Sequence, residues 1–196
     1  MMKAKTLVVI LVALLLGSQM IAYGETKILY DFENGLDGWE IPDWSFEDDN
    51  YRAEKIDVSE DFASSGKSSL RIDADLTGGS WQGAIVEVME YMDWTPYSTI
   101  ACDVLIPPDA PEGLKAKIIL TVGEKWSWTE MSRSVKLTPG GWMTITANLL
   151  PGSMDWKRIN PTDEFRADVR KINVRIESNK KPAFTGPFYV DRVRVE

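Results

Sequence analysis

Short runs of β-prone residues, separated by turn residues, fill the chain from residue 27 onward. Apolar and polar residues alternate in several of them, as in 171–176 and 190–195, and a period of two is that of a strand with one buried face. Pairs such as Gly78-Gly79 and Pro107-Pro108 mark turns. The pattern predicts nine strands, at 27–32, 68–73, 82–89, 98–106, 115–122, 128–137, 142–147, 170–177 and 187–195. A short helical turn is expected only at 160–168.

Many short strands with almost no helical periodicity predict an all-β fold, a β-sandwich jelly roll of two antiparallel sheets. Residues 25–196 contain no internal repeat, low-complexity tract or linker, so we expect one domain, large enough to bury a core without disulfides or metals. The single cysteine, Cys102, lies in the apolar-rich stretch 99–104 and is interpreted as a small core residue.

The first 24 residues have the pattern of a secretory signal peptide. Lys3 and Lys5 precede an apolar run over 7–16, and small residues follow at 22–24, where a signal peptidase would cleave. The run is too short to span a membrane, which takes about 20 apolar residues. We therefore expect 25–196 to be secreted, extracellular and free of the membrane, with retention of the segment as a tether as the alternative.

Charge and composition limit the partners. The chain has 22 Lys and Arg against 30 Asp and Glu, a formal net charge of −8, and its first 24 residues hold two of the lysines and no acid. Such a protein repels nucleic acid, anionic lipid and strongly anionic polysaccharides, which leaves a neutral ligand as the expectation. The chain contains no histidine, which excludes a catalytic Ser-His or Cys-His pair.

Eight tryptophans supply the candidate chemistry. Large aromatic residues fill cores, and we interpret Trp39, Trp94 and Trp142 as structural because they adjoin turns or begin strands. Trp156 is left open between core and surface. Four others are surrounded by polar and small residues and are predicted to be exposed: Trp44, Trp81, Trp126 and Trp128.

Exposed tryptophans beside carboxylates are suited to sugar binding. If the strand is regular, alternation places Trp126, Trp128 and Glu130 on one face. Pyranose rings stack on indoles, each stack contributing on the order of 1–2 kcal/mol, while their hydroxyls bond to polar side chains. Neighbouring polar residues would orient the chain, and those selected are Gln82, Glu124, Glu130 and Arg133.

A family resemblance selects the same residues. The run 100–107 (Ile-Ala-Cys-Asp-Val-Leu-Ile-Pro), followed by 111–115, resembles the central strand and proline loop of the mannan-binding carbohydrate-binding modules of family twenty-seven. Segments 30–35, 64–70 and 186–193 resemble pieces found across the galactose-binding-like jelly rolls, including the β-glucan binders of family eleven. The resemblance covers the whole of 25–196. It implies a sugar cleft at Trp44, Trp81 and Trp126, with Trp128 beside them, for mannan, glucomannan or β-glucan.

The resemblance also implies a structural calcium ion, held by acids of the first strand, a carbonyl at the Ser-Gly turn and the aspartate of the last strand. The matching positions are Asp31, Glu33, the backbone carbonyl near Lys67 and Asp191. Ca²⁺ takes six to eight oxygen ligands, which agrees with such a mixture. The alternative is that these are ordinary solvated acids. The chain also departs from the family pattern, because Arg192 stands where the family usually has asparagine.

We therefore predict a monomeric, non-catalytic protein that binds a polysaccharide. Two alternatives stay open. The first is a secreted or cell-surface interaction domain for a protein partner or a small ligand, with the tryptophans in a flat or convex patch. The second is a small glycoside hydrolase or lyase, whose two carboxylates would lie ~5–10 Å apart. Acids available for such a pair are Glu87, Glu90, Glu124 and Glu130.

Overall fold

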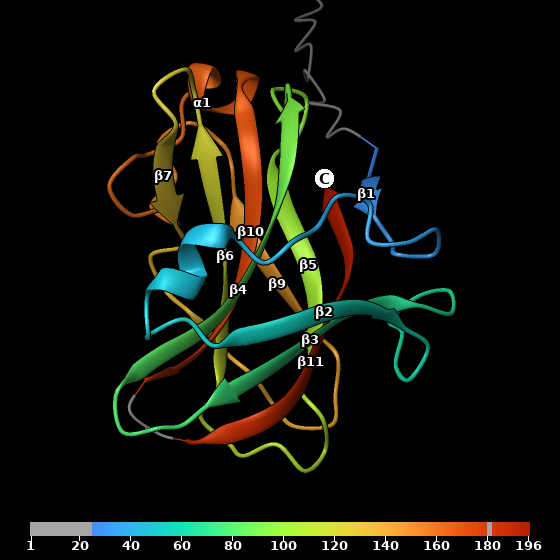
Figure 1. The fold of residues 1–196 in the computed structure, drawn as a ribbon. Coiled ribbons are helices and arrows are strands. Elements are labelled where there is room, and N and C mark those ends of the chain that lie inside the picture. The colour runs from blue at the N-terminus through green and yellow to red at the C-terminus, as the bar shows by residue number, and fades with distance from the viewer. Residues whose placement is uncertain (1–24, 180–181) are drawn as a thin grey trace, which may run out of the picture.

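The computed structural model describes residues 25–179 and 182–196, so the predicted signal peptide at 1–24 lies outside it. The described residues form eleven strands and two short helices (Figure 1). The elements are β1 (Lys27–Tyr30), η1 (Asp43–Glu47, a 3-10 helix), β2 (Ala53–Ser59), β3 (Ser69–Leu76), β4 (Trp81–Met92), β5 (Thr99–Leu105), β6 (Lys115–Val122), β7 (Ser127–Glu130), β8 (Val135–Lys136), β9 (Met143–Asn148), α1 (Asp163–Ala167), β10 (Val169–Asn179) and β11 (Phe184–Val195).

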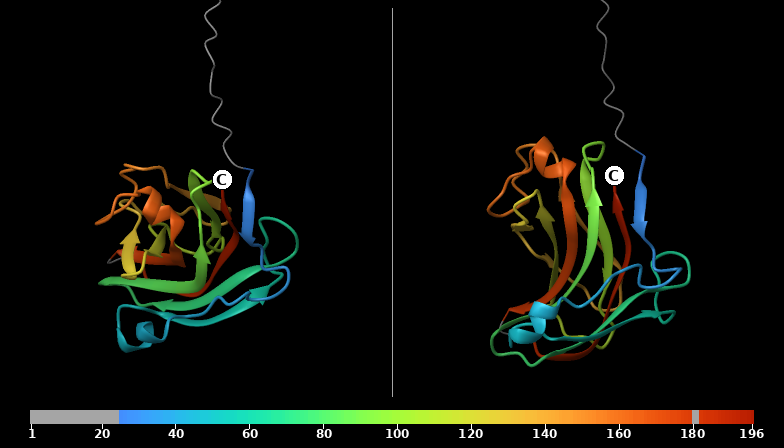
Figure 2. Two further views of the ribbon diagram at one scale, coloured as in Figure 1. Left: turned by 90° about the horizontal axis from the view of Figure 1, so that it is seen from above. Right: turned by 45° about the horizontal axis from the view of Figure 1, so that its top comes forward.

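The strands form two antiparallel sheets that pack as a sandwich (Figure 2). The first sheet has the order β2-β3-β11-β5-β9, with β1 beside β11. The second has the order β4-β10-β6-β7, with β8 also beside β6. Several neighbours, such as β3 and β11 or β4 and β10, are far apart in sequence, as in a jelly roll. The predicted all-β sandwich fold is therefore confirmed.

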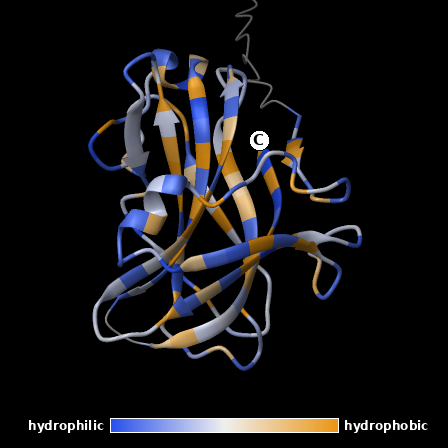
Figure 3. Cartoon of the chain, in the orientation of Figure 1, coloured by the Kyte–Doolittle hydropathy of each residue, from blue (hydrophilic) through white to orange (hydrophobic). Residues whose placement is uncertain are grey.

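Alternation along the strands builds the core between the sheets. In β10, Ile172, Val174 and Ile176 are fully buried and belong to one apolar cluster with residues of both sheets. The alternation is visible along the ribbon in Figure 3. Cys102 on β5 is fully buried in the same cluster, as predicted.

The structure differs from the predicted strands in two places. Strand β2 was not predicted, because it is a sheet edge with charged residues such as Glu54, Lys55 and Asp57 and offers little apolar signal. The predicted strand 128–137 is two separate strands, β7 and β8. The predicted helical turn is the five-residue α1, whose first turn is capped by Thr162 Oγ1 accepting from the Phe165 N–H at 3.1 Å.

The middle of the second sheet is buried on both faces along β10, although the alternation predicted only one buried face. Asn173, Arg175 and Glu177 point away from the core, yet each is at most 6% exposed. Other side chains and segments therefore cover the outer face of this sheet at β10. Among the residues that the structure describes, no helix is long and apolar enough to cross a membrane.

Candidate functional site

The segment between β1 and β2 carries aromatic residues over the outer face of the second sheet. It runs along the edge of β4, where Glu40 and Glu87 exchange two backbone hydrogen bonds of 2.9 Å and the Arg52 N–H donates to the Gly83 carbonyl at 2.9 Å. Between these anchors, η1 lies in front of the sheet in Figure 1 and carries Trp44. The segment has fixed ends, which position its aromatic side chains.

Four aromatic rings meet edge to face across this sheet. The Trp44 ring lies 6.2 Å from the Trp128 ring and 4.8 Å from the Tyr51 ring, measured between centroids. The Tyr51 ring in turn lies 5.6 Å from the Trp81 ring. Edge-to-face contacts stabilise such pairs by about 0.5–1.5 kcal/mol beyond the area that they bury. The rings therefore form a continuous wall from β7 to the start of β4.

Charged side chains lie on the sheet beneath this wall. Arg175 Nη2 lies 2.7 Å from Glu130 Oε2 and 3.2 Å from Glu177 Oε2. Glu130 Oε1 also pairs with Lys157 at 2.8 Å and with Lys117 at 3.4 Å.

Glu177 accepts two further hydrogen bonds. The Trp81 Nε1–H donates to one of its oxygens at 3.4 Å, and Ser134 donates to the other. The acids and bases of this face thus form one network.

The wall and the network border a cavity of about 450 Å³ that is open to solvent. We call it the aromatic cleft, and its lining consists of Trp44, Tyr51, Trp128, Glu130, Arg158 and Arg175. Trp44 is 40% exposed, so part of its ring is available to a ligand. The cleft offers both apolar ring surface and charged hydrogen-bonding groups.

The cations around Glu130 fix its charge. Burial alone would raise the pKa of Glu130, but Lys157, Arg175 and Lys117 outweigh that effect and lower the pKa to about 2. Glu130 is therefore ionised at neutral pH and acts as a hydrogen-bond acceptor. A carboxylate with this pKa is not a general acid.

The structure brings four of the predicted site residues together, namely Trp44, Trp81, Trp128 and Glu130. Trp81 is held differently from the rest, because the Arg175 guanidinium lies over its ring at 5.0 Å from the centroid. One face of Trp81 is thereby occupied.

Trp126 does not share the surroundings of Trp128, so the predicted regular strand is wrong at this point. It precedes β7 in a turn, where its N–H donates to the Gly123 carbonyl and its φ of +53° breaks the alternation. Its ring is 43% exposed and contacts Tyr91 at 6.0 Å and the Arg170 guanidinium at 5.1 Å. Trp126 therefore forms a second, separate aromatic group.

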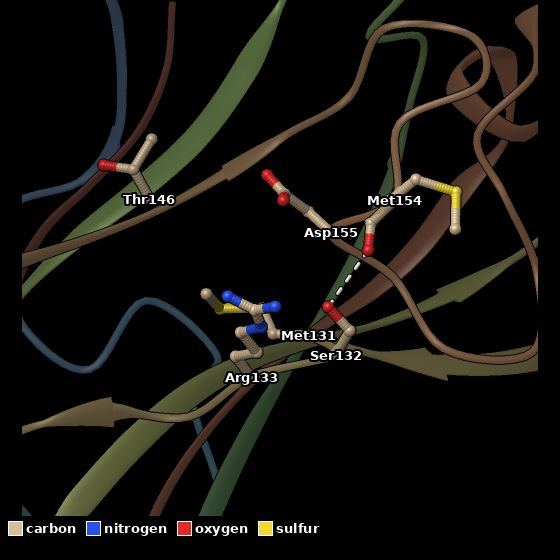
Figure 4. Close-up of a pocket in the computed structure, with 6 residues that line it drawn as sticks. All are labelled: Met131, Ser132, Arg133, Thr146, Met154 and Asp155. Atoms are coloured by element: carbon tan, nitrogen blue, oxygen red, sulfur yellow. Dashed lines mark hydrogen bonds between the residues drawn. The ribbon is translucent and has the colours of Figure 1, made fainter.

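Three predicted polar residues lie away from the aromatic cleft. Gln82 is only 3% exposed and exchanges hydrogen bonds with Thr77, because alternation along β4 turns it opposite to Trp81. Glu124 is exposed in the turn before β7 and borders a separate hollow beside α1. Arg133 borders another cavity, of about 530 Å³, together with Met131, Ser132, Thr146, Met154 and Asp155 (Figure 4).

Of the three tryptophans interpreted as structural, two are buried and one is not. Trp39 and Trp94 are at most 3% exposed, as predicted, while Trp142 is half-buried. Trp156, which the sequence left open, is a core residue at 3% exposure, and its Nε1–H donates to the Asn148 carbonyl at 2.7 Å.

Two of the predicted calcium ligands, Glu33 and Asp191, accept hydrogen bonds from the turn at 64–68. Glu33 Oε1 accepts from the N–H groups of Lys67 and Ser68, both at 2.8 Å, and these bonds lower the Glu33 pKa. Buried Asp191 accepts from Ser64, Ser65 and Arg192, so both of its oxygens are engaged. Within 25–179 and 182–196, no three acidic, cysteine or histidine side chains form a group that could hold a metal ion.

Oxygen donors are nonetheless available at Asp31 and Glu33. Asp31 Oδ1 accepts from the Glu33 N–H at 3.2 Å, and one oxygen each of Asp31 and Glu33 has no hydrogen bond with the described residues. Carboxylate and carbonyl oxygens are the ligands that Ca²⁺ prefers. The donor types fit the ion at Asp31 and Glu33, whereas Asp191 is occupied in positioning the turn.

Sequence reasoning missed three residues that line the aromatic cleft. Tyr51 stands among polar residues at 48–52, which is the same signal that selected Trp44. Arg175 lies on the polar face of the alternating run 171–176, a face that was assigned to solvent. No sequence signal marks Arg158, because it reaches the cleft from a loop that pairs with β7 only in the folded chain.

The chain matches the model of a known protein family. Residues 30–192 match the family model described as "Mannanase, galactose-binding domain-like". A comparison with curated protein sequences found no match.

Three solved structures share the fold. The first family 27 carbohydrate-binding module of Caldicellulosiruptor saccharolyticus, solved with mannohexaose, is 19% identical with a TM-score of 0.61, over 88% of this chain and 97% of that one. A family 28 module specific for non-crystalline cellulose is 16% identical with a TM-score of 0.62, over 88% and 96%. The family 11 module of a cellulosomal cellulase from Clostridium thermocellum is 18% identical with a TM-score of 0.52, over 87% and 94%.

Proposed function

The chain belongs to the family of galactose-binding-like mannanase domains, and we propose from this that it is a carbohydrate-binding module that binds a β-linked polysaccharide in the aromatic cleft. The observation that carries the proposal is the wall of Trp128, Trp44 and Tyr51 above an ionised network on one sheet face. Sugar rings have apolar faces that stack on such rings and hydroxyl groups that bond to charged side chains. Structures of the same fold include modules solved with mannohexaose and with a β-1,3-1,4-mixed-linked tetrasaccharide.

Trp44 and Trp128 are the proposed stacking residues, because both line the cleft. Trp81 supports them indirectly, since Arg175 covers one of its faces. Each stack contributes on the order of 1–2 kcal/mol, and two stacks together with hydrogen bonds, less the cost of association, suit a weak to moderate binder. The proposed ligands are mannan, glucomannan and β-glucan.

The chemistry of the cleft favours binding over hydrolysis. Glu130 is the acid among the described residues that line the cleft, and its pKa of about 2 keeps it ionised. A glycosidase needs a second carboxyl group with a raised pKa on the other side of the scissile bond. We therefore propose a non-catalytic role, in a secreted protein that acts as a monomer.

A panel of polysaccharides tests the proposal. Affinity electrophoresis and calorimetry would be run with glucomannan, galactomannan, barley β-glucan, xyloglucan and xylan. We expect micromolar to millimolar binding to a mannan or a glucan, which corresponds to about 4–8 kcal/mol. Absence of binding across the panel would contradict the proposed function and favour the interaction-domain alternative.

A further inference from the structure

Positive charge exceeds negative charge around the aromatic cleft. The charged residues that line it, or that pair with those that do, are Arg158, Arg175, Lys117, Lys157, Glu130 and Glu177. Four of these six are cations. The chain as a whole has a formal net charge of −8, so the cleft is locally opposite in sign to the protein.

Most of these cations already have partners. Arg175 bridges Glu130 and Glu177, while Lys157 and Lys117 both approach Glu130. Arg158 differs, because its side chain forms no ion pair or hydrogen bond with any residue of the described ranges. It is an exposed guanidinium at a cleft whose acids are already compensated.

The backbone just before Arg158 holds this residue in position. The Lys157 N–H donates to the Glu130 carbonyl at 2.8 Å, and the Lys157 carbonyl accepts from Thr129 Oγ1 at 2.6 Å. The preceding Trp156 is buried and pairs with Met131. The loop is thus tied to β7, and Arg158 lines the same cavity as Trp44 and Trp128.

We propose that the aromatic cleft prefers a polysaccharide with isolated carboxylate groups, that is, uronic acid side groups on an otherwise neutral β-linked backbone, and that Arg158 pairs with the carboxylate. The inference rests on the proposed function and names its ligand class. Arginine is suited to this role because its planar guanidinium donates two parallel hydrogen bonds to a carboxylate.

Sparse charge on the ligand follows from the limited extent of the positive region. Asp48 and Asp49 line a separate hollow beside Phe46 on η1, and the whole chain is acidic. A polymer with a carboxylate on every ring would meet this acidic surface on leaving the cleft. The acidic surface of the chain therefore disfavours dense polyanions, whereas the cleft admits a single carboxylate at Arg158.

Matched ligands test the inference. Polysaccharides with sparse uronic acid side groups, on xylan and on mannan-containing backbones, would each be compared with their carboxyl-reduced forms, which keep the backbone and lose the charge. Calorimetry on the full chain would be repeated with Arg158→Gln, and with Arg133→Gln as the control, since Arg133 is an exposed arginine at a different cavity.

We expect at least one acidic form to bind about tenfold more tightly than its reduced form, the ratio given by a charge-assisted hydrogen bond of modest strength. The ratio should fall toward one in Arg158→Gln, persist in Arg133→Gln, and shrink at about 0.5 M NaCl, where the Debye length is roughly 4 Å.

Two results would overturn the inference. Equal affinity for acidic and reduced forms on every backbone, with neutral polysaccharides still bound, contradicts the preference for carboxylate and leaves the proposed function standing. No binding to any acidic, reduced or neutral polysaccharide contradicts the proposed function, and the inference with it.

Discussion

The guanidinium carbon of Arg175 lies 5.0 Å from the centroid of the Trp81 ring. Trp81 begins β4 and Arg175 lies on the neighbouring β10, where the same guanidinium also reaches Glu130 and Glu177. The indole thus covers a cation that neutralises two acids on a buried sheet face. This relationship gives Trp81 a supporting role in the aromatic cleft and makes Arg175 the centre of its ionic network.

Replacing Arg175 tests that network. Arg175→Met leaves Glu130 and Glu177 without their shared partner, and removing one member of a buried pair costs about 3–5 kcal/mol. We expect the free energy of unfolding, measured in urea, to fall by that amount. Arg133→Met should change it by about 0.5 kcal/mol or less, as an exposed control. A similar small loss in both variants would show that the network contributes little to stability.

The stability of the protein should depend on the charge of Glu130. Its folded pKa of about 2 is below the unfolded value, so its contribution is fully present above about pH 4.5 and disappears as the pH falls toward 2. At neutral pH the contribution is of order 3 kcal/mol. Urea unfolding of wild type and Glu130→Gln should differ most near pH 7, differ less near pH 3 and converge as the pH approaches 2. A difference that stays constant over this range would exclude the ionised network as its source.

Cys102 reports on the integrity of the core. Burial raises the pKa of its thiol to about 12, and the residue is inaccessible in the folded protein. We expect no reaction with a disulfide reagent at about pH 8, and stoichiometric reaction once the protein is unfolded in guanidinium chloride. Rapid reaction of the folded protein would mean that β5 opens under native conditions.

Calcium binding remains a prediction, and we propose Asp31 and Glu33 as its side-chain ligands. Thermal unfolding with excess calcium and with EDTA tests it. A calcium ion present at 100 times its Kd would stabilise the folded protein by about 2.7 kcal/mol. In a domain of this size, each kcal/mol raises Tm by about 2–4 °C. We expect Tm to be higher in calcium than in EDTA for the wild type, and Asp31→Asn to remove this difference in Tm. Identical Tm values in calcium and EDTA would rule out a structural ion.

The alternation of side chains was sufficient to predict the fold, but only part of the site. Trp44 and Trp128 were selected because they stand among polar residues, and the structure brings their rings to 6.2 Å. Trp126 was placed with them by assuming a regular strand, whereas a left-handed residue in a turn is not visible in a period of two. Arg158 reaches the cleft through a contact between a loop and β7, which depends on the folded chain.

The central claim is that the cleft binds sugar through Trp44 and Trp128. The most direct measurement is calorimetry of Trp44→Ala and Trp128→Ala against the polysaccharide of the panel that wild type binds most tightly, with Phe46→Ala as the control. Phe46 lies on the same η1 helix and is 64% exposed, but lines a different hollow.

We expect each tryptophan variant to lose about 1–2 kcal/mol, or roughly five- to thirtyfold in Kd, as the loss of one stacked ring implies. Phe46→Ala should bind like wild type. Unchanged affinity in both tryptophan variants, in protein shown to be folded, would contradict the account.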